Sequence, residues 1–528
     1  MVPVSSKRLF MRIFFHVAIS GVVHVLAYPV TNAAEVVLDS TPQAGLPAAG
    51  IAGRLSHVSD ASRGVWLDTG SNWTSVSAET FDVKQFGAKG DGVADDIGAI
   101  LAAVNAADAR GGGIVLFPPG FYLVSSAIPL RNNIQYVGSG NSTYIQSKAG
   151  SQDNVFGEAY NTAQVHNVVI RDLLIDGNNA SVLLQNDVSK QNGIRWDRVS
   201  YSKITNVTII NTVFNAISIY NQSNSNLVAF NRIQGIGSSQ AAGTQCGVLL
   251  EFGSSRNKVI ENHIVTTRQY GICESGVGAL SENNLIDGNY IGSSQYDGIR
   301  IGFDSGSNII RGTKVSANTI EGVIDAQSQG IRLYHAGAGT IEDVLVFGNT
   351  VKGGGQHGIL VSDTNVIRCI ALANQIIGNA ATGLMDNGSG GISAHNIAAG
   401  NAYSFNSVRN ESIVSGNAFD GQPLNAFVLR GSLKIGEAGD LIAGRLSGSS
   451  PWDPPSIANN ASASFAFGLP GAQVGDTVLV GFSPAVPGGV LVTGAANPSG
   501  MVTVSLLNTT GAPLDLPASN VRAEVWKH

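Results

Sequence analysis

Charged residues are scarce in this chain of 528 residues, at 13%, and aromatic residues are scarcer still, at 7%. There is no excess of basic residues either, because the formal net charge is -6. A composition of this kind gives no basic surface from which to infer nucleic-acid binding, so we expect no nucleic-acid partner. Glycine is abundant instead, with 65 residues, and this abundance indicates many tight turns.

Cysteine is almost absent, and the three cysteines are Cys246, Cys273 and Cys369. No Cys or His spacing in the chain matches a zinc motif, so we expect no metal site. Cys246 precedes a glycine, whereas Cys273 lies two residues after a later glycine. If both stood on straight, stacked strands, they would be offset by about 10 Å, too far for a disulfide. The sequence therefore predicts buried free thiols.

Long apolar runs are also rare, and the one stretch of this kind is Ile13–Ala27. Basic residues precede the run and small residues follow it, a pattern typical of an export signal over residues 1–34. A membrane anchor is the alternative, but the run is short and contains two histidines. We predict a secreted, periplasmic or cell-surface protein whose mature chain has no membrane span.

An imperfect repeat is the main feature of the sequence between about 165 and 407. In each copy an Asn-x-Ile/Val step precedes a Gly-apolar-x-apolar step. The repeated asparagines are Asn231, Asn262, Asn289, Asn318, Asn349 and Asn374, and the repeated glycines are Gly193, Gly247, Gly271, Gly298, Gly330, Gly358 and Gly383. The period is too long for a coiled coil, and the copies are too rich in β-branched residues for a helical solenoid. The repeat predicts a β-solenoid.

Each copy alternates Val, Ile and Leu with polar residues, which is the pattern of strands with one buried face. When the copies stack, each asparagine lies above its counterpart in the previous coil. Its amide can then bond backbone groups that a tight corner leaves unpaired. We therefore predict a structural ladder of asparagine side chains.

Upstream of the repeat, the chain resembles the pectate-lyase-like right-handed parallel β-helix superfamily. The matching segments are Phe86–Gly92, Asp95–Asp96, Gly111–Gly113 and Phe117–Tyr122. The resemblance implies that this segment starts the solenoid and that its helix, expected over 97–110, caps the core. Asp95 and Asp96 are expected to cap that helix, because their spacing does not fit a calcium loop.

The predicted fold is all-β, a right-handed parallel β-helix with an N-terminal capping helix and a small C-terminal antiparallel β-domain. We expect an extension over 35–80, the β-helix over 81–435, a Pro- and Ser-rich linker over 436–457 and the C-terminal module over 458–528. The module is typical of an end cap or an assembly element, which would be compatible with a homotrimer.

Residues two and four positions after each repeat glycine are expected on one exposed sheet. They place Arg300, Arg332 and Tyr334 together, with His335 and Asp304 nearby. These residues, apart from Asp304, are the predicted catalytic group. The predicted substrate-binding residues are Asp197, Tyr220, Glu251 and Asp304.

Arginine binds a carboxylate through two parallel hydrogen bonds. Aromatic rings stack on sugars, and carboxylates accept hydroxyl protons. The predicted partner is therefore an acidic, uronate-containing polysaccharide. Arg300 and Arg332 would neutralise its carboxylate while Tyr334 or His335 moves a proton, giving a β-eliminating lyase, or a C5-epimerase if the proton returns on the other face. Hydrolysis needs two carboxylates, and the candidates are Glu251, Glu274, Asp297 and Asp304.

The sequence departs from well-known members of this superfamily. Alginate C5-epimerases carry an Asp-Pro-His step on such a strand, whereas the comparable Ala216–Tyr220 reads Ala-Ile-Ser-Ile-Tyr. The set of motifs typical of polygalacturonases is missing from the repeats too. A non-catalytic surface or tailspike-like glycan-binding protein is therefore the alternative to a lyase. No cofactor is predicted, and a requirement for calcium stays open.

Overall fold

The computed structural model describes residues 80–161, 163–184, 187–302, 309–335, 337, 339–407 and 444–527, with short stretches between 40 and 75 and between 413 and 442. The predicted export signal over 1–34 and the candidate Asp304 lie outside the described residues. The chain divides into two units, Met1–Ser77 and Ala78–His528. In the first unit, one four-stranded sheet contains β1 (Ser40–Thr41), β2 (Leu55–Val58), β3 (Gly64–Asp68) and β4 (Trp73–Ser75).

The second unit begins with β5 (Thr80–Asp82), β6 (Asp91–Asp95) and the helix α1 (Ile97–Ala109). Helix α1 buries Ile100 and Val104 and packs against β5 and β7 (Gly113–Leu116). The helix thus forms where the sequence predicts it and covers apolar residues at this end of the solenoid.

The two aspartates before α1 differ in their roles. Asp95 Oδ1 accepts from the Ile97 backbone N–H at 3.3 Å, as expected of a capping residue. Asp96 is the N-cap residue by position, but its carboxylate turns away and accepts from Lys89 N at 2.6 Å and Gly90 N at 3.1 Å. The expectation that Asp96 caps the helix through its side chain is therefore wrong: its carboxylate instead holds the preceding turn.

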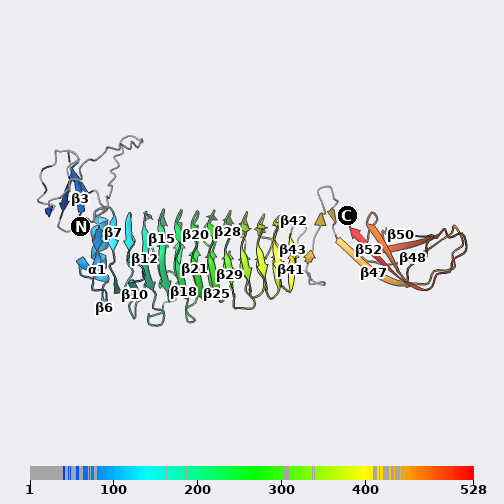
Figure 1. Cartoon of the computed structure of the whole chain (residues 1–528), viewed down its shortest axis with the longest axis horizontal. Coiled ribbons are helices and arrows are strands. Elements are labelled where there is room, and N and C mark those ends of the chain that lie inside the picture. Colours follow the sequence, from blue (N-terminus) through cyan, green and yellow to red (C-terminus); the bar gives the residue numbers. More distant parts are fainter. Residues whose placement is uncertain are drawn as a thin grey trace, which may run out of the picture. The chain divides into compact units, whose positions relative to one another are not determined.

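From here the chain winds into coils whose strands stack in parallel (Figure 1). One sheet of 24 strands runs from β5 to β43 (Ala418–Phe419) and contains up to two strands from each coil. A second sheet, here called the ten-stranded face, takes one strand from each coil. Its members are β13 (Ile194–Asp197), β16 (Ile217–Tyr220), β19 (Cys246–Leu250), β22 (Tyr270–Glu274), β26 (Ile299–Ile301), β30 (Ile331–Leu333), β34 (Ile359–Val361), β38 (Thr382–Asp386), β41 (Tyr403–Ser407) and β44 (Phe427–Leu429).

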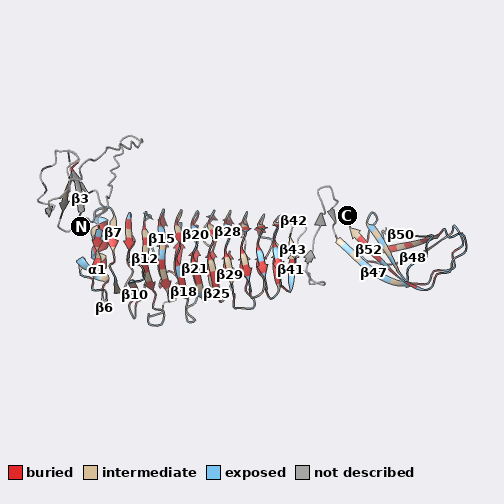
Figure 2. Ribbon diagram, in the orientation of Figure 1, coloured by how far each residue is buried: buried red, intermediate tan, exposed pale blue. Residues whose placement is uncertain are grey.

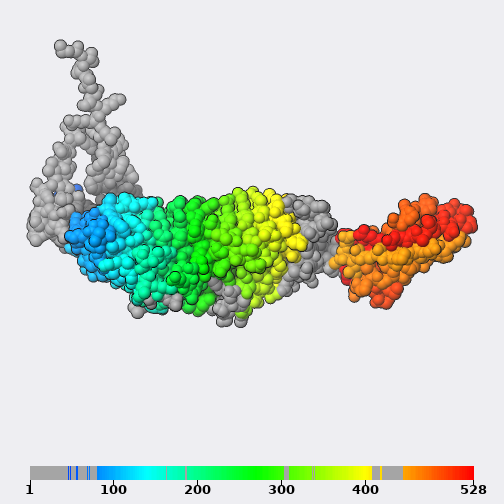
Figure 3. Space-filling view, turned by 90° about the horizontal axis from the view of Figure 1, so that it is seen from below, coloured from blue at the N-terminus to red at the C-terminus, as the bar shows by residue number. Residues whose placement is uncertain are grey.

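The core of the solenoid consists of aliphatic columns that run from coil to coil. Ile272, Ile299, Ile331 and Ile359 are register neighbours in successive strands, and each is fully buried. Figure 2 shows buried residues throughout the stacked strands, and Figure 3 shows the colour changing steadily from blue to yellow, so segments close in sequence form neighbouring coils. The predicted parallel β-helix is confirmed.

The repeat glycines are required by the closeness of the coils. A Cβ atom on Gly298 would lie 2.7 Å from the carbonyl oxygen of Gly330 in the next coil and 2.5 Å from Cγ2 of Ile320. Because real Cβ contacts do not come this close to backbone, a side chain here would force the coils apart.

The predicted asparagine ladder is present and longer than expected. Asn289 Nδ2 donates to Asn318 Oδ1 at 2.9 Å and to the carbonyl oxygen of Val259 at 2.8 Å. Its own Oδ1 accepts from the N–H and the side-chain amide of Asn262 at 3.0 and 2.9 Å. The same pattern continues past Asn374 to Asn396 and Asn417. Each amide thus satisfies buried backbone groups on both sides of a corner.

We expect Asn289→Ala to lower the free energy of unfolding by about 3 kcal/mol, because several buried polar groups lose their partner at once. Urea unfolding followed by circular dichroism measures the change. Asn289→Asp is the matched control: it keeps an acceptor for Asn262 but loses the donors, so part of the loss should remain. A variant as stable as the parent would show that the ladder contributes nothing.

The C-terminal module consists of two antiparallel sheets that share one core. The first contains β47 (Gly444–Trp452), β52 (Ser519–Lys527) and β49 (Thr477–Ser483), and the second β48 (Ser462–Gly468), β51 (Met501–Asn508) and β50 (Val490–Asn497). Strand β47 lies inside the predicted linker, yet it pairs with β52 from Gly444 to Trp452. That part of the linker prediction is wrong, because Leu446 and Trp452 pack into the module core despite the Ser-rich sequence between them.

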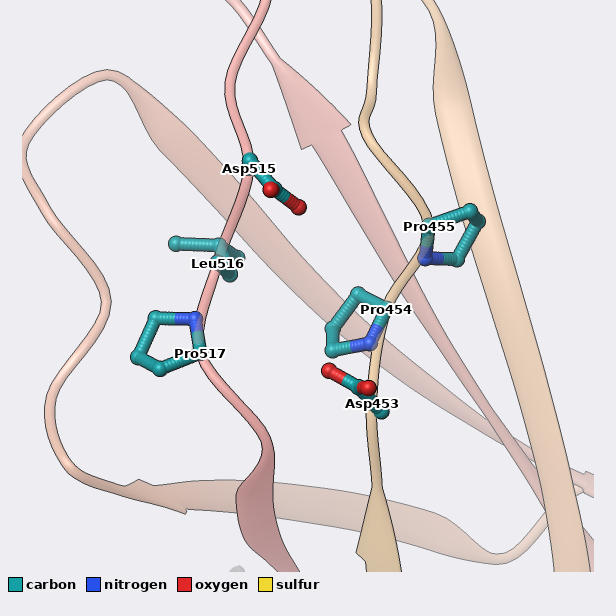
Figure 4. Close-up of a pocket in the computed structure, with 6 residues that line it drawn as sticks. All are labelled: Asp453, Pro454, Pro455, Asp515, Leu516 and Pro517. Carbon is teal, nitrogen blue, oxygen red and sulfur yellow. The ribbon is translucent and has the colours of Figure 1, made fainter.

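A shallow depression of about 680 Å³ lies on this module between residues 453–455 and 515–517. Figure 4 shows Asp453 and Asp515 on its two sides, with Leu516 and three prolines completing the lining. Both carboxylates are exposed. Exposed acidic residues are the usual composition of a solvated surface, so this depression does not define a ligand.

Candidate active site on the ten-stranded face

The predicted column of residues two positions after the glycine is formed as expected. Arg195 neighbours Ser218, and the column continues through Leu249, Cys273 and Arg300 to Arg332 and Leu360. Arg300 and Arg332 are therefore direct neighbours on adjacent strands. The face is less open than predicted, because Arg195 and Arg300 are only 2% and 3% exposed.

The first group of residues, here called the arginine cluster, consists of Tyr270, Asp297, Arg300, Arg332 and Tyr334. Both guanidinium groups lie against the ring of Tyr334, with ring-centroid distances of 4.1 Å for Arg332 and 5.6 Å for Arg300. An aromatic face attracts cations, so one ring stabilises two neighbouring positive charges.

Two members of the arginine cluster come from the position just before a repeat glycine. Arg300 Nη1 donates to the Tyr270 hydroxyl at 2.7 Å, and Arg332 Nη1 lies 3.9 Å from Asp297 Oδ2. Asp297 is 1% exposed. Asp297, which the sequence suggested only as a carboxylate for hydrolysis, thus partly balances the charge of Arg332.

The same position also corrects the expectation of free thiols. Cys246 and Cys273 form a disulfide, with 6.2 Å between their Cα atoms. The 10 Å offset assumed straight strands, whereas the residue before the glycine lies diagonally beside the column of the next coil, as Tyr270 does beside Arg300. Of the described cysteines, Cys369 alone is free, and it is buried as predicted.

A second group, here called the acidic cluster, contains Arg195, Asp197, Tyr220 and Glu251. The Arg195 guanidinium lies 4.1 Å from the centroid of the Tyr220 ring and donates to Ala159 O at 3.0 Å and Ser218 Oγ at 3.2 Å. Burial raises the pKa of Asp197 and of Glu251, although Arg195 opposes the rise in both. Asp197 neighbours Tyr220 in register, so these predicted binding residues do come together.

Glu274, one of the carboxylates considered for hydrolysis, is not part of this face. It is fully buried, and its Oε1 accepts from Ser281 Oγ, Asn284 Nδ2 and Thr313 Oγ1 at 2.7, 2.8 and 3.0 Å. Burial raises its pKa. The strand alternation turns Glu274 into the core, because its neighbour Cys273 occupies the outward column.

The buried Glu274 predicts a pH dependence of stability. Its folded pKa lies above the ordinary value, so its contribution is fully present below that value and is lost as pH rises through the folded pKa. Glu274→Gln stays neutral at every pH. We therefore expect the variant to gain stability relative to the parent between pH 5 and pH 8, as measured by thermal unfolding at both values. A difference that stays constant with pH would contradict the assignment.

The histidines near the arginine cluster differ in access. His335 is 3% exposed, and its Nδ1 has no hydrogen-bond partner among the described residues. Burial lowers its pKa, so its neutral form is favoured. His357, which the sequence reasoning missed, is half-buried and also stands before a repeat glycine. The pattern that could have found Tyr270 is the position just before each repeat glycine, which in this case reaches the arginine of the next coil.

Comparison with known proteins places the fold in a family. Residues 80–327 match the family model described as rhamnogalacturonase A/epimerase, pectate lyase-like. A tailspike protein mutant of E. coli bacteriophage HK620, solved in complex with pentasaccharide, superposes with a TM-score of 0.55 at 15% identity over 87% of this chain and 96% of that chain. Over residues 80–327 the chain is therefore similar to a pectate lyase-like family, and it shares the parallel β-helix fold.

Curated relatives of this β-helix protein match over a short part of it. The mannuronan C5-epimerase AlgE6 of Azotobacter vinelandii is 42% identical over 113 residues, which are 20% of this chain and 13% of that protein. Alginate lyase 7 of the same organism is 41% identical over 108 residues, 19% of this chain and 13% of that protein. The chain thus spans only a small part of the length of these relatives.

The ten-stranded face of this β-helix protein combines cations, phenols and carboxyl groups. In the described part of the chain, no three His, Cys, Asp or Glu side chains gather closely enough to hold a metal ion. No helix found there is long and apolar enough to cross a membrane. The chemistry that these side chains offer directly is charge neutralisation by arginine and proton transfer by phenol or carboxyl groups.

Proposed function

We propose that this protein is a carbohydrate-active enzyme that cleaves an acidic, uronate-containing polysaccharide by β-elimination. The observation that carries the proposal is the arginine cluster, in which two neighbouring guanidinium groups share the Tyr334 ring beside the Tyr270 hydroxyl. Arginine neutralises a carboxylate through paired hydrogen bonds, and this makes the adjacent carbon more acidic.

In the proposed reaction, Arg332 binds the carboxylate of one sugar. Tyr270 acts in its phenolate form, and its oxygen takes the proton from the carbon next to that carboxylate, while the electron pair moves onto the carboxylate, which Arg332 stabilises. Arg300 donates to the Tyr270 oxygen at 2.7 Å and so stabilises the phenolate before the proton is taken. The pair then forms a double bond to the next carbon and expels the glycosidic oxygen, which takes up the proton that Tyr270 removed, so Tyr270 ends as it began.

The relatives support this class of reaction. One is named a mannuronan C5-epimerase and another an alginate lyase, and both reactions begin with removal of the proton beside a uronate carboxylate. Epimerisation would need the proton to return on the opposite face of the sugar instead of expulsion of the glycosidic oxygen. The acidic substrate class is therefore the part of the proposal that both names favour.

The test is to incubate the purified protein with alginate and with polygalacturonate and to follow ultraviolet absorbance together with product mass. Elimination creates unsaturated chain ends that absorb, and this is the expected result. New reducing ends without absorbance would indicate hydrolysis, and a changed uronate isomer at constant polymer mass would indicate epimerisation. Unchanged polymer on every acidic and neutral glycan would overturn catalysis in favour of tailspike-like binding.

The acidic cluster favours hydrolysis as the second candidate. Asp197 and Glu251 both have a pKa raised by burial, which suits a general acid. They belong to coils two steps apart, a separation of roughly 10 Å at the usual strand spacing, near the upper end of the range for inverting glycosidases. Glu251→Gln would remove hydrolysis at this cluster but leave elimination at the arginine cluster intact.

Location and assembly complete the proposal. A polysaccharide substrate of this kind fits a secreted, periplasmic or cell-surface protein. Assembly into a homotrimer through the C-terminal module stays a prediction.

A further inference from the structure

The Cys246–Cys273 disulfide and the Tyr270–Arg300 pair lie on the same diagonal of the ten-stranded face, one coil apart. In each case the residue just before a repeat glycine meets the column residue of the following coil. The two pairs are also register neighbours, since Cys246 lies beside Tyr270 and Cys273 lies beside Arg300. The cross-link therefore stands directly beside both members of the pair that the proposed reaction uses.

A small apolar cluster contains the disulfide. Cys246 and Cys273 are fully buried, Leu249 is 2% exposed, and these three residues form a cluster separate from the core of the solenoid. Tyr270 is partly buried and packs against this cluster. The Tyr270 side chain thus rests on the disulfide cluster while its oxygen accepts from Arg300 at 2.7 Å.

Strand register alone does not fix where the Tyr270 oxygen lies. A tyrosine side chain turns about two bonds, so its oxygen can move while the strand stays in place. A disulfide holds its two side chains in one arrangement, whereas two free thiols can each adopt other rotamers. Because the cluster has only three members, a rearrangement of the cysteines changes the surface on which Tyr270 packs. A displacement of about 1 Å in a reacting group lowers a rate by about a hundredfold.

We infer that the Cys246–Cys273 disulfide is a positioning element for the proposed proton acceptor, because it fixes the cluster on which Tyr270 packs and so keeps the phenol oxygen on Arg300. This inference rests on the proposed function and adds the requirement that the protein be oxidised for full turnover. Neither sulfur takes part in the reaction, since both cysteines are fully buried. The proposed secreted, periplasmic or cell-surface location fits, because disulfides form and persist in oxidising compartments.

Three variants test the cross-link: Cys246→Ser, Cys273→Ser and the two together. Each single substitution already breaks the disulfide, so each should lose as much as the double variant, whereas independent packing roles would add. Cys369→Ser is the matched control, because Cys369 is also buried but is not cross-linked. If a serine variant does not fold, the alanine variant at the same position replaces it, since alanine places no hydroxyl in the apolar cluster.

Two measurements separate positioning from stability. The first is kcat and KM on the eliminating substrate well below the melting temperature, and we expect kcat to fall about tenfold or more while KM stays within about threefold. The second is ultraviolet titration of the Tyr270 phenol, taken as the difference between each protein and the same protein with Tyr270→Phe. We expect the phenol to ionise about one pH unit higher in the cysteine variants, because the phenolate loses part of its bond from Arg300. Cys369→Ser should match the parent in both.

A lower melting temperature with parental kcat and a parental titration would overturn the inference, since the disulfide would then only stabilise the fold. A fall in kcat without the titration shift would overturn it as well, as would losses that add in the double variant or appear equally in Cys369→Ser. The titration does not depend on turnover. If it shifts as expected but the parent eliminates no uronate polymer, the proposed function fails while the positioning of Tyr270 stands. If the parent eliminates and the cysteine variants match it in both measurements, only the role of the disulfide fails.

Discussion

Arg332→Ala is expected to lower kcat/KM on a uronate polysaccharide by about a hundredfold to a thousandfold, the usual effect of removing a group that stabilises developing negative charge. Folding should remain nearly intact. The side chain is partly exposed and makes no hydrogen bond to a described residue, and Asp297 keeps the bond that its Oδ1 accepts from Gln329 N at 2.8 Å. Steady-state kinetics with the melting temperature as the folding control measures both parts.

Arg332→Lys is the matched variant, because it keeps the positive charge but loses the planar pair of donors. It should retain an intermediate activity. Arg300→Ala is expected to act in the same direction but more weakly on substrate binding, and it should cost more stability, since Arg300 is 3% exposed and bonded to Tyr270. Full activity of Arg332→Ala on the true substrate would move the site to the acidic cluster of Asp197, Tyr220 and Glu251.

The fold was predictable because the features that specify it repeat locally in the sequence. Each coil carries its own glycine, its own asparagine and its own alternation of aliphatic residues. Gly298 is needed because Gly330 O lies 2.7 Å from where its Cβ would be, and Asn289 because it bonds Asn318 and Val259. Because every coil needs the same glycine and asparagine at the same place, these residues recur at a regular spacing that can be seen in a single sequence.

The only part of the site that could be predicted is the column of residues two positions after each repeat glycine, where inward and outward side chains alternate strictly. Arg300 and Arg332 are neighbours because the register follows the repeat. Tyr270 was not assigned to the face, and Asp297 was considered only as a carboxylate for hydrolysis, since a residue before the glycine is expected to point inward if the strand is treated as straight. In the structure Tyr270 instead bonds Arg300, and Asp297 lies 3.9 Å from Arg332 Nη1.

The disulfide is a second case in which treating the strands as straight gave the wrong distance. A straight-strand register separates Cys246 from Cys273 by about 10 Å, whereas the diagonal across adjacent coils brings their Cα atoms to 6.2 Å. Burial was missed for a related reason: Asp197 and Arg300 occupy outward positions, yet both are almost fully covered. The repeat period predicts whether a side chain points inward or outward. It does not predict how far that side chain is buried, because the corners and loops that cover it do not follow the repeat.

Tyr270→Phe is expected to lower kcat by about a hundredfold to ten-thousandfold with little change in KM. The substitution keeps the ring but removes the oxygen that takes the proton in the proposed reaction. Arg300 loses one acceptor but keeps the bond from its Nε to Gly302 O at 3.2 Å. Kinetics on the eliminating substrate and calorimetric binding to the same polymer separate the loss of turnover from a loss of affinity.

Tyr296→Phe is the matched control for this prediction. Its ring centroid lies 5.7 Å from that of Tyr270, but its side chain is 38% exposed and no described residue bonds its hydroxyl. It should keep kcat within about twofold, because it removes a phenol from the same surface without touching Arg300. Tyr334→Phe tests the competing assignment, since Tyr334 supports both arginines through its ring and keeps that contact as phenylalanine. If Tyr334→Phe loses turnover and Tyr270→Phe does not, the proton acceptor is Tyr334, and Tyr270 only holds Arg300 in position.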